Sequence, residues 1–303
     1  MTTMPLAASV KGGLLAAGWY ANRLEHDVFP GVLGLCYHGL RASASDAGVP
    51  FANLHVIAET FEAHCRVMAE TCHPIDLETF CAAQGGGSLP DRPVLVTFDD
   101  GYRSVFELAR PILKRYRIPA AVFVNSEPVK TQRLFWFDAV ARARGEEAVS
   151  EMRALPDEGW RQASQAFDTP AGAAPHLAPM TESQVRQLAD EGVAIGVHSA
   201  SHAPLGGAPV AVQEHELASC RAALETWTGR PADTLAYPFG APQLDYDEGT
   251  IAVASRLGFR AGFTTRQDFA RPAEPSLERS RFVMLASITA AELAHRIAYS
   301  WRR

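Results

Sequence analysis

Residues 94–102 read VLVTFDDGY, an apolar run that ends in two adjacent carboxylates and a glycine. A run of β-branched and aromatic residues without polar alternation predicts a strand covered on both faces, as in a parallel sheet or barrel. Asp99 and Asp100 would then stand where that buried strand ends. Ionised carboxylates are costly to bury without a cation or hydrogen-bond donors, so the pair indicates a metal site, and a solvated Asp-Gly turn is the alternative.

A second apolar run, VAIGV at residues 193–197, leads directly into His198 and His202. Histidines four positions apart share one face of a helix, and a turn can also bring them to one ion. Together with one aspartate they would give three ligands and leave a position open for water, which is typical of a catalytic metal. The alternative is one histidine in the core and another in a loop.

The bulk composition excludes several classes of function. With 303 residues the chain is long enough for one large α/β domain or two smaller ones. A net charge of -6 gives no basic surface of the kind that nucleic-acid binding needs, so no nucleic-acid partner is expected. The five cysteines are odd in number and lack CxxC spacing, which argues for reduced thiols.

Residues 1–30 are expected to form a helical leader. Lys11 and Gly12 interrupt its apolar stretch, and no basic segment precedes a long apolar core. It is therefore predicted neither to span a membrane nor to act as a secretory signal, and a cytoplasmic location is expected. Trp19 and Tyr20, near the end of an amphipathic first helix, leave a peripheral membrane contact open.

The rest of the chain alternates strand-like and helix-like segments. The run at 32–37 leads into His38, and the DDGY strand is followed by a helix expected from about Ser104 to Tyr116 and a strand at 120–124. Further strands are expected near 234–237, 260–264 and 282–283. Such units imply parallel pairing with the chemistry at the carboxyl ends of the strands, and about seven steps favour a single barrel.

Residues 127–180 break this rhythm and are interpreted as a helical insertion on the rim of the barrel. The segment from Glu146 to Asp168 is charged and predicts helix and loop. Trp136, within the FWFD segment at 135–138, could stack on a sugar. The alternative is that it belongs to the core, where aromatic residues at helical spacing are more often found.

Three motifs, TFDDGY, HSASH and YPFG, occur in an order and at separations that resemble the NodB-type polysaccharide deacetylases, carbohydrate esterase family four. The resemblance covers roughly residues 32–285 and implies an irregular (β/α)7 barrel in the α/β class, with a catalytic domain at 31–303. The early CYHGL motif is similar to the permuted subgroup that includes bacterial poly-N-acetylglucosamine deacetylases.

The resemblance also implies roles for the candidate residues. Asp99 would be the general base, and Asp100, His198 and His202 would hold a divalent metal. Zinc (Zn2+) is the usual ion in the family, and cobalt, nickel or iron (Co2+, Ni2+, Fe2+) also suits two imidazoles and one carboxylate. One carboxylate binds the cation while its neighbour stays free to take a proton from water, whose pKa the ion lowers.

The YPFG turn would contribute to the oxyanion hole and to substrate binding. By the same resemblance, the backbone N–H of Phe239 is the expected oxyanion donor, and Tyr237, Pro238 and Gly240 would belong to the same site. These residues follow the strand expected at 234–237, so they too would lie at a strand's carboxyl end.

The chain departs from the commonest family pattern in two places. Residues 282–285 contain no histidine where a Leu-x-His motif would supply the general acid, so His38 of the early Tyr-His pair is assigned that role. Ala236 stands where many members carry an arginine that tethers the catalytic aspartate. Arg281 and Arg279, which precede the last strand, are the candidates to replace it, with Arg281 preferred.

These observations predict a metal-dependent hydrolase that removes the N-acetyl group of an amino sugar in a bacterial polysaccharide or its precursor. The expected partner is therefore an acylated amino-sugar glycan. The alternatives are a deformylase or an O-acetyl esterase acting on a sugar. An inactive barrel that only binds glycan is a further alternative, suggested by Ala236, but Asp99 argues against it because binding alone needs no free base.

Overall fold

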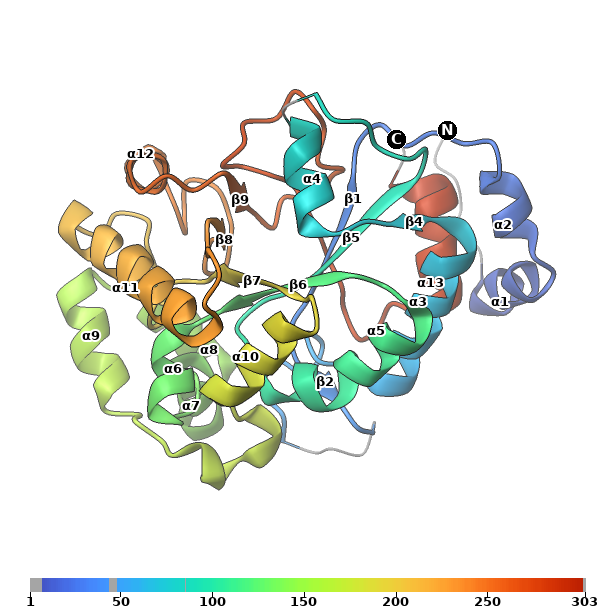
Figure 1. Ribbon diagram of the computed structural model, residues 1–303. Coiled ribbons are helices and arrows are strands. Elements are labelled where there is room, and N and C mark those ends of the chain that lie inside the picture. The colour runs from blue at the N-terminus through green and yellow to red at the C-terminus, as the bar shows by residue number, and fades with distance from the viewer. Residues whose placement is uncertain (1–6, 44–47, 85, 302–303) are drawn as a thin grey trace.

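The computed structural model describes residues 7–43, 48–84 and 86–301. Its centre is a curled, parallel sheet that helices surround (Figure 1). The strands follow the order β10-β1-β5-β6-β7-β8-β9, and the short β4 also pairs with β5. The bounds of these strands are β1 Leu33–Tyr37, β4 His73–Pro74, β5 Pro93–Phe98, β6 Ala120–Val124, β7 Ala194–Val197, β8 Thr234–Ala236, β9 Ala261–Phe263 and β10 Phe282–Val283. A separate parallel pair joins β2 Leu40–Arg41 to β3 Val56–Ile57.

The helices occupy the segments between and around the strands. They are α1 Ala8–Ala16, α2 Trp19–Leu24, α3 Ala58–Thr71, α4 Leu77–Gln84, α5 Arg110–Tyr116, α6 Ser126–Thr131, α7 Trp136–Arg144, α8 Glu146–Arg153, α9 Asp157–Gln165, α10 Glu182–Asp190, α11 Val210–Thr228, α12 Glu248–Arg256 and α13 Ala290–His295. Two short 3-10 helices, Ala171–Ala173 and Pro175–Leu177, and two π-helical turns, Val105–Ala109 and Arg296–Ser300, complete the set. No helix in the described ranges combines the length and the hydropathy that crossing a bilayer requires.

The central strands are buried because they are apolar on both faces. Every residue of β1, β5 and β6 is buried, as expected for strands between an inner core and an outer layer of helices. β1 and β5 pair in register from Leu33 with Val94 to Tyr37 with Phe98. Seven parallel strands with surrounding helices confirm the predicted irregular (β/α)7 barrel. Parallel pairing also brings the residues that follow these strands to one edge of the sheet.

The helix expected at 104–116 is present in a modified form. Its first part, Val105–Ala109, is a π-helical turn, and α5 begins at Arg110 with Pro111 in its first turn. Proline lacks a backbone N–H and is tolerated at a helix start, so the wider turn lets the chain continue in one direction without a broken hydrogen bond.

The predicted leader and the predicted insertion both form helices. Residues 1–6 of the leader lie outside the described range, while α1 and α2 lie beside the C-terminal α13 (Figure 1). Lys11 forms an ion pair with Glu292 at 2.5 Å, and Tyr20 stacks edge-on against His295. Residues 127–180 contain most of α6 and all of α7, α8 and α9.

Candidate active site

Three side chains that are distant in sequence converge at the carboxyl ends of β5 and β7. The Oδ1 atom of Asp100 lies 3.3 Å from the Nε2 atom of His198 and 3.3 Å from that of His202. All three residues are buried. Two ligand atoms on a tetrahedral zinc ion at its usual bond lengths are about 3.3 Å apart, so the spacing fits one metal ion.

The orientation of His198 makes its contact with Asp100 unfavourable without a positive charge between the two residues. Its Nδ1 atom lies 2.7 Å from the carbonyl oxygen of Ala236 and therefore carries the proton, which leaves the Nε2 lone pair facing Asp100. Oδ1 of Asp100 receives no hydrogen bond from any residue in the described ranges. With a neutral ring, two acceptor atoms would face each other in a buried site, and either a proton on Nε2 or a metal ion between the two atoms satisfies both.

Burial and charge set the protonation of this carboxylate. Burial alone would raise the pKa of Asp100, but the neighbouring imidazoles of His198 and His202 outweigh it and hold the pKa well below its ordinary value. Asp100 is therefore an anion at neutral pH, which is the form that binds a metal ion.

Backbone hydrogen bonds fix the loop that carries the two histidines. His202 N donates to Ser199 Oγ at 3.0 Å, and the indole Nε1 of Trp136 donates to the carbonyl oxygen of His202 at 3.0 Å. Asn125, which follows β6, donates its side-chain amide to the carbonyl oxygens of His198 and Ser199. The loop is thus held by the neighbouring strand end and by α7.

Several of these residues have left-handed backbone conformations. The φ angle is 72° at Asp100, 64° at Ser199, 60° at His202 and 60° at Phe239. Residues other than glycine rarely adopt positive φ, and such conformations cluster at functional sites because the surrounding structure enforces them. In Asp100 and His202 the conformation directs the side chain toward the shared position.

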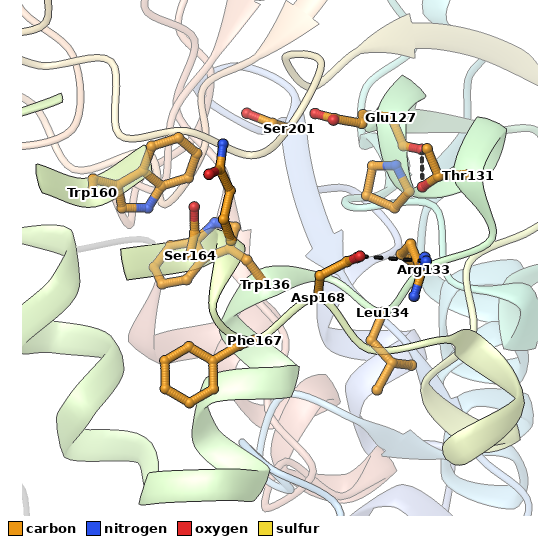
Figure 2. A pocket seen from close by; sticks show the side chains of 12 residues that line it. Glu127, Thr131, Arg133, Leu134, Trp136, Trp160, Ser164, Phe167, Asp168 and Ser201 are labelled. Carbon is orange, nitrogen blue, oxygen red and sulfur yellow. Dashed lines mark hydrogen bonds and ion pairs between the residues drawn. The ribbon is translucent and has the colours of Figure 1, made fainter. Parts of the chain in front are cut away.

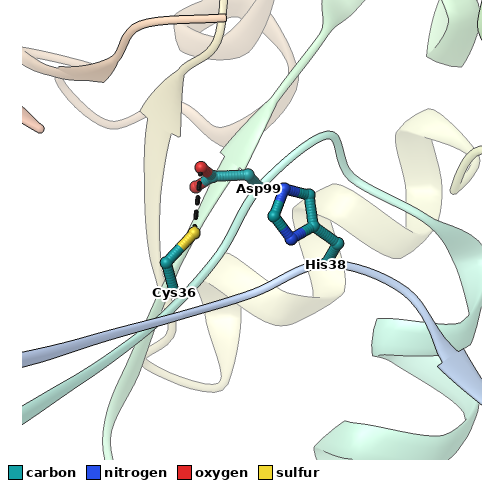
Figure 3. A group of neighbouring side chains, drawn as sticks. All are labelled: Cys36, His38 and Asp99. Carbon is teal, nitrogen blue, oxygen red and sulfur yellow. Dashed lines mark hydrogen bonds between the residues drawn. The ribbon is translucent and has the colours of Figure 1, made fainter. Parts of the chain in front are cut away.

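Asp99 lies beside this group and is held by a different set of donors. Arg281 donates two hydrogen bonds of 2.8 Å, from Nη1 to Oδ1 and from Nη2 to Oδ2. The thiol of Cys36 donates to Oδ2 at 3.3 Å, and Figure 3 shows it pointing at the carboxylate with the His38 ring alongside. Burial would raise the pKa of Asp99, but the charge of Arg281 outweighs it and lowers that pKa.

Arg281, which does not come from the YPFG strand, makes the bidentate contact with Asp99. Its side chain is fully buried, its Nε donates to the carbonyl oxygen of Thr264 and its Nη1 also donates to Thr97 Oγ1. Arg279, the other candidate, instead donates to the carbonyl oxygen of Arg271. The bidentate contact therefore selects Arg281 from the two arginines that the sequence offered.

The YPFG turn supplies one free backbone donor. Tyr237 N donates to the carbonyl oxygen of Phe263 and Gly240 N to that of Pro238, whereas the N–H of Phe239 has no acceptor in the described part of the chain. The side chain of Tyr237 is buried in a stack on Tyr246, so it builds the turn and does not face the cavity.

These residues surround a cavity of about 320 Å³. His38, Asp99, Asp100, His198, His202 and Phe239 all line it. The rings of Phe137 and Phe239 lie 4.7 and 4.6 Å from that of His202 and shield it from solvent. Trp136 is not among the lining residues and is 8% exposed, so in this cavity it supports the histidine loop and offers no stacking surface.

Sequence reasoning missed the contribution of Cys36, which was interpreted only as a reduced thiol. Cys36 and His38 stand two positions apart at the end of β1, where alternate side chains point to the same face. Their ligand atoms and a carboxylate oxygen of Asp99 all lie within 4.8 Å of one another. The alternation that placed His38 at the site therefore also indicated Cys36.

Comparisons with known proteins identify relatives of this chain. The chain is 23% identical to YxkH of Bacillus subtilis over 235 residues, which cover 76% of this chain and 63% of YxkH. It is 32% identical to a poly-beta-1,6-N-acetyl-D-glucosamine N-deacetylase of Staphylococcus aureus over 68 residues, or 22% of this chain and 23% of that one. The chain thus spans less than two thirds of the length of these relatives.

Two solved structures have the same fold. The deacetylase PplD of Streptococcus pyogenes, in complex with acetate, superimposes with a TM-score of 0.67 at 22% identity over 88% of this chain and 98% of that one. IcaB of Ammonifex degensii gives a TM-score of 0.65 at 20% identity over 90% and 99%. The family model for polysaccharide deacetylase matches residues 86–262, which is more than half of the chain and includes both the aspartate pair and the two histidines. The chain therefore belongs to the polysaccharide deacetylase family.

Proposed function

We propose that this protein is a metal-dependent deacetylase that hydrolyses the N-acetyl group of an amino sugar in a polysaccharide or its precursor. The convergence of Asp100 Oδ1 with the Nε2 atoms of His198 and His202 carries the proposal, because one metal ion would satisfy all three atoms in the cavity that Asp99 and His38 also line. Membership of the family and the partial match to a poly-N-acetylglucosamine deacetylase support the substrate class.

Asp100, His198 and His202 would hold the metal ion. When bound, a divalent cation supplies Lewis acidity that polarises the acetyl carbonyl and lowers the pKa of the attacking water. Zinc suits two imidazoles and one carboxylate, and cobalt, nickel or iron can take the same ligands. The tautomer of His198, fixed by the carbonyl oxygen of Ala236, presents the ligating nitrogen.

Asp99 would accept the proton of the attacking water at Oδ1. Each oxygen of a carboxylate has two lone pairs. Both lone pairs of Oδ2 have donors, from Arg281 and Cys36, whereas Oδ1 accepts only from Arg281 among the residues that the structure describes. The lowered pKa of Asp99 keeps the carboxylate ionised at neutral pH, as a base must be before the reaction.

His38 and the N–H of Phe239 would complete the reaction. An amine leaves only after its nitrogen is protonated, and His38 lines the cavity beside Asp99 with its Nδ1 lacking a partner among the described residues. The free N–H of Phe239 would donate to the oxygen on which negative charge develops.

Release of acetate from N-acetylglucosamine oligomers tests the proposal. We expect equal amounts of acetate and free amine, loss of both after chelation, and recovery when zinc or cobalt is added back. N-Formyl and O-acetyl sugars serve as parallel substrates, since formate release alone would make the protein a deformylase and release from the ester alone would make it an esterase. No metal-dependent product from any of these sugars would reject the proposal.

A further inference from the structure

A second cavity, of about 650 Å³, lies within the inserted helices. Its walls come from α6, from the start of α7, from α9 and from the loop between the two histidines. None of the residues proposed to bind metal or move protons lines it. Figure 2 shows Trp160 and Ser164 on one side, Glu127, Thr131 and Arg133 on the other, and Asp168 between them.

The walls combine aromatic rings with hydrogen-bonding groups. Trp136 and Trp160 form an edge-on pair with centroids 5.6 Å apart, and Ser164 and Thr131 place hydroxyl groups in the same cavity. Trp160 is only 3% exposed, and its Nε1 has no hydrogen-bond partner anywhere in the described ranges. A buried indole N–H without an acceptor is costly, so it points to a ligand that brings an oxygen atom.

The charges of the cavity favour a ligand with a positive group. Asp168 forms an ion pair with Arg133 at 3.4 Å, which leaves the carboxylate of Glu127 without a balancing cation among the lining residues. Burial and the nearby Glu216 raise the pKa of Glu127, and the charges of Arg161 and His215, which do not line the cavity, offset this rise only in part. An ammonium group in the cavity would compensate this carboxylate.

We propose that this second cavity binds a hexosamine unit that carries a free amine, and so recognises glycan that has already been deacetylated. The inference rests on the proposed function, because the amine is the group that deacetylation creates. An amino sugar offers an apolar face for the partly buried ring of Phe167 and the edges of the two indoles, an oxygen for the N–H of Trp160 and an ammonium group for Glu127.

The second cavity contacts the loop that holds the proposed metal ligands. Trp136 lines it and donates to the carbonyl oxygen of His202, while Ser201, the residue before His202, forms another part of the wall. Phe137, the next residue along α7, lines the catalytic cavity. The two cavities are therefore separated by the first residues of α7 and by this loop. A glycan unit in the second cavity would contact Trp136 and Ser201, which hold the loop of the proposed metal ligands in place.

Two substitutions on α9 provide a matched test by isothermal titration calorimetry with a glucosamine hexamer, which is not a substrate. Gln165 lines the cavity and Gln162, on the same helix, does not, and both are exposed. Gln165→Trp should weaken binding at least about tenfold, whereas Gln162→Trp should change it by less than about twofold. Equal affinity of the two variants, with both melting as the wild type does, would overturn the proposal.

Two further measurements keep the test decisive if Gln165→Trp does not fold. Trp160→Phe retains an aromatic ring but removes the N–H, and we expect affinity to fall by about fivefold. In the Asp99→Asn background, which prevents turnover, the N-acetylated hexamer should bind more weakly than the amine hexamer. Wild-type affinity in Trp160→Phe, or an equal affinity for the two hexamers, would reject an amine-binding site.

The outcome separates this inference from the proposed function. If the wild type releases no acetate but binds the amine hexamer in a Gln165-dependent manner, only the proposed function fails. If it releases acetate and Gln165→Trp binds the hexamer as well as Gln162→Trp does, only the second cavity loses its assignment.

Discussion

Arg281, at the start of the last strand, donates two parallel hydrogen bonds of 2.8 Å to the carboxylate of Asp99, 182 residues earlier in the chain. Both side chains are buried, so neither charge is compensated by water. A buried ion pair with this geometry fixes the orientation of the proposed base, which a single point charge would not do.

We therefore expect Arg281→Lys to lower kcat by about 100-fold with little change in KM, because lysine keeps the charge but not the planar pair of donors. Arg281→Met should in addition cost about 3–5 kcal/mol of unfolding free energy by leaving Asp99 buried and unpaired. Steady-state kinetics and denaturant unfolding measure the two effects. Arg279→Lys is the matched control, and an equal loss of kcat in that variant would contradict the tether.

The adjacent aspartate and histidine should separate catalysis from metal binding. Asp99→Asn is expected to lower kcat by about 10³-fold and to keep its metal, because it removes the proton acceptor and leaves the three ligands in place. His202→Ala should lose the metal, since only two ligands remain. Elemental analysis of both proteins, purified in parallel, checks the contrast. Equal metal content in the two variants would show that these roles are misassigned.

His38 should matter for amides far more than for esters. An alkoxide or phenoxide can leave without a proton, whereas an amine cannot. His38→Ala should therefore lower kcat/KM for an N-acetylated sugar by about 10²–10⁴-fold and for an activated acetate ester by less than about tenfold. The two substrates act as controls for one another. A similar loss with both would assign His38 a role in metal or substrate binding.

The stability of the protein should depend on pH through His64, which is fully buried in α3. Its Nδ1 contacts the hydroxyl of Tyr37 at 3.1 Å and its Nε2 the carbonyl oxygen of Ile288 at 2.8 Å, which suits a neutral ring. Burial lowers its pKa from 6.5 to about 4. The unfolded chain therefore binds the proton first, so the contribution of His64 is complete above pH 6.5 and is lost as the pH falls toward 4.

Unfolding free energies of the wild type and His64→Gln from pH 7.5 to pH 4.5 test this dependence. The advantage of the wild type should shrink by about 1.4 kcal/mol for each pH unit below 6.5. His215→Gln changes an exposed histidine on α11 and is the matched control. An advantage of the wild type over His64→Gln that does not change with pH would exclude this buried imidazole as the cause.

The convergence of the proposed metal ligands could be predicted because most of them directly follow a strand-like run in the sequence. Asp99, Asp100 and His198 each follow an apolar strand, and parallel pairing brings such positions together whatever the intervening sequence. The same rule placed His38 in the cavity. In each case, recognising the apolar strand and the residue that follows it was sufficient to predict where the side chain lies.

Other features depend on long-range packing that no local pattern encodes. Arg281 reaches Asp99 because β10 pairs with β1 and β1 pairs with β5. The sequence alone does not reveal this order of strands in the sheet. The π-helical turn at Val105–Ala109 has the same hydrophobic pattern as an ordinary helix. The second cavity arises from the mutual placement of α6, α7 and α9, which the sequence of each helix by itself does not determine.

The positive φ angles of Asp100 and His202 limit how far this protein could be stabilised. Glycine adopts positive φ angles without strain, so a glycine at either position would raise the free energy of unfolding by about 1 kcal/mol or more. Glycine, however, has no side chain with which to bind an ion. Substitutions that raise thermal stability must therefore lie elsewhere in the barrel. The most strained backbone positions belong to residues whose side chains the proposed reaction needs.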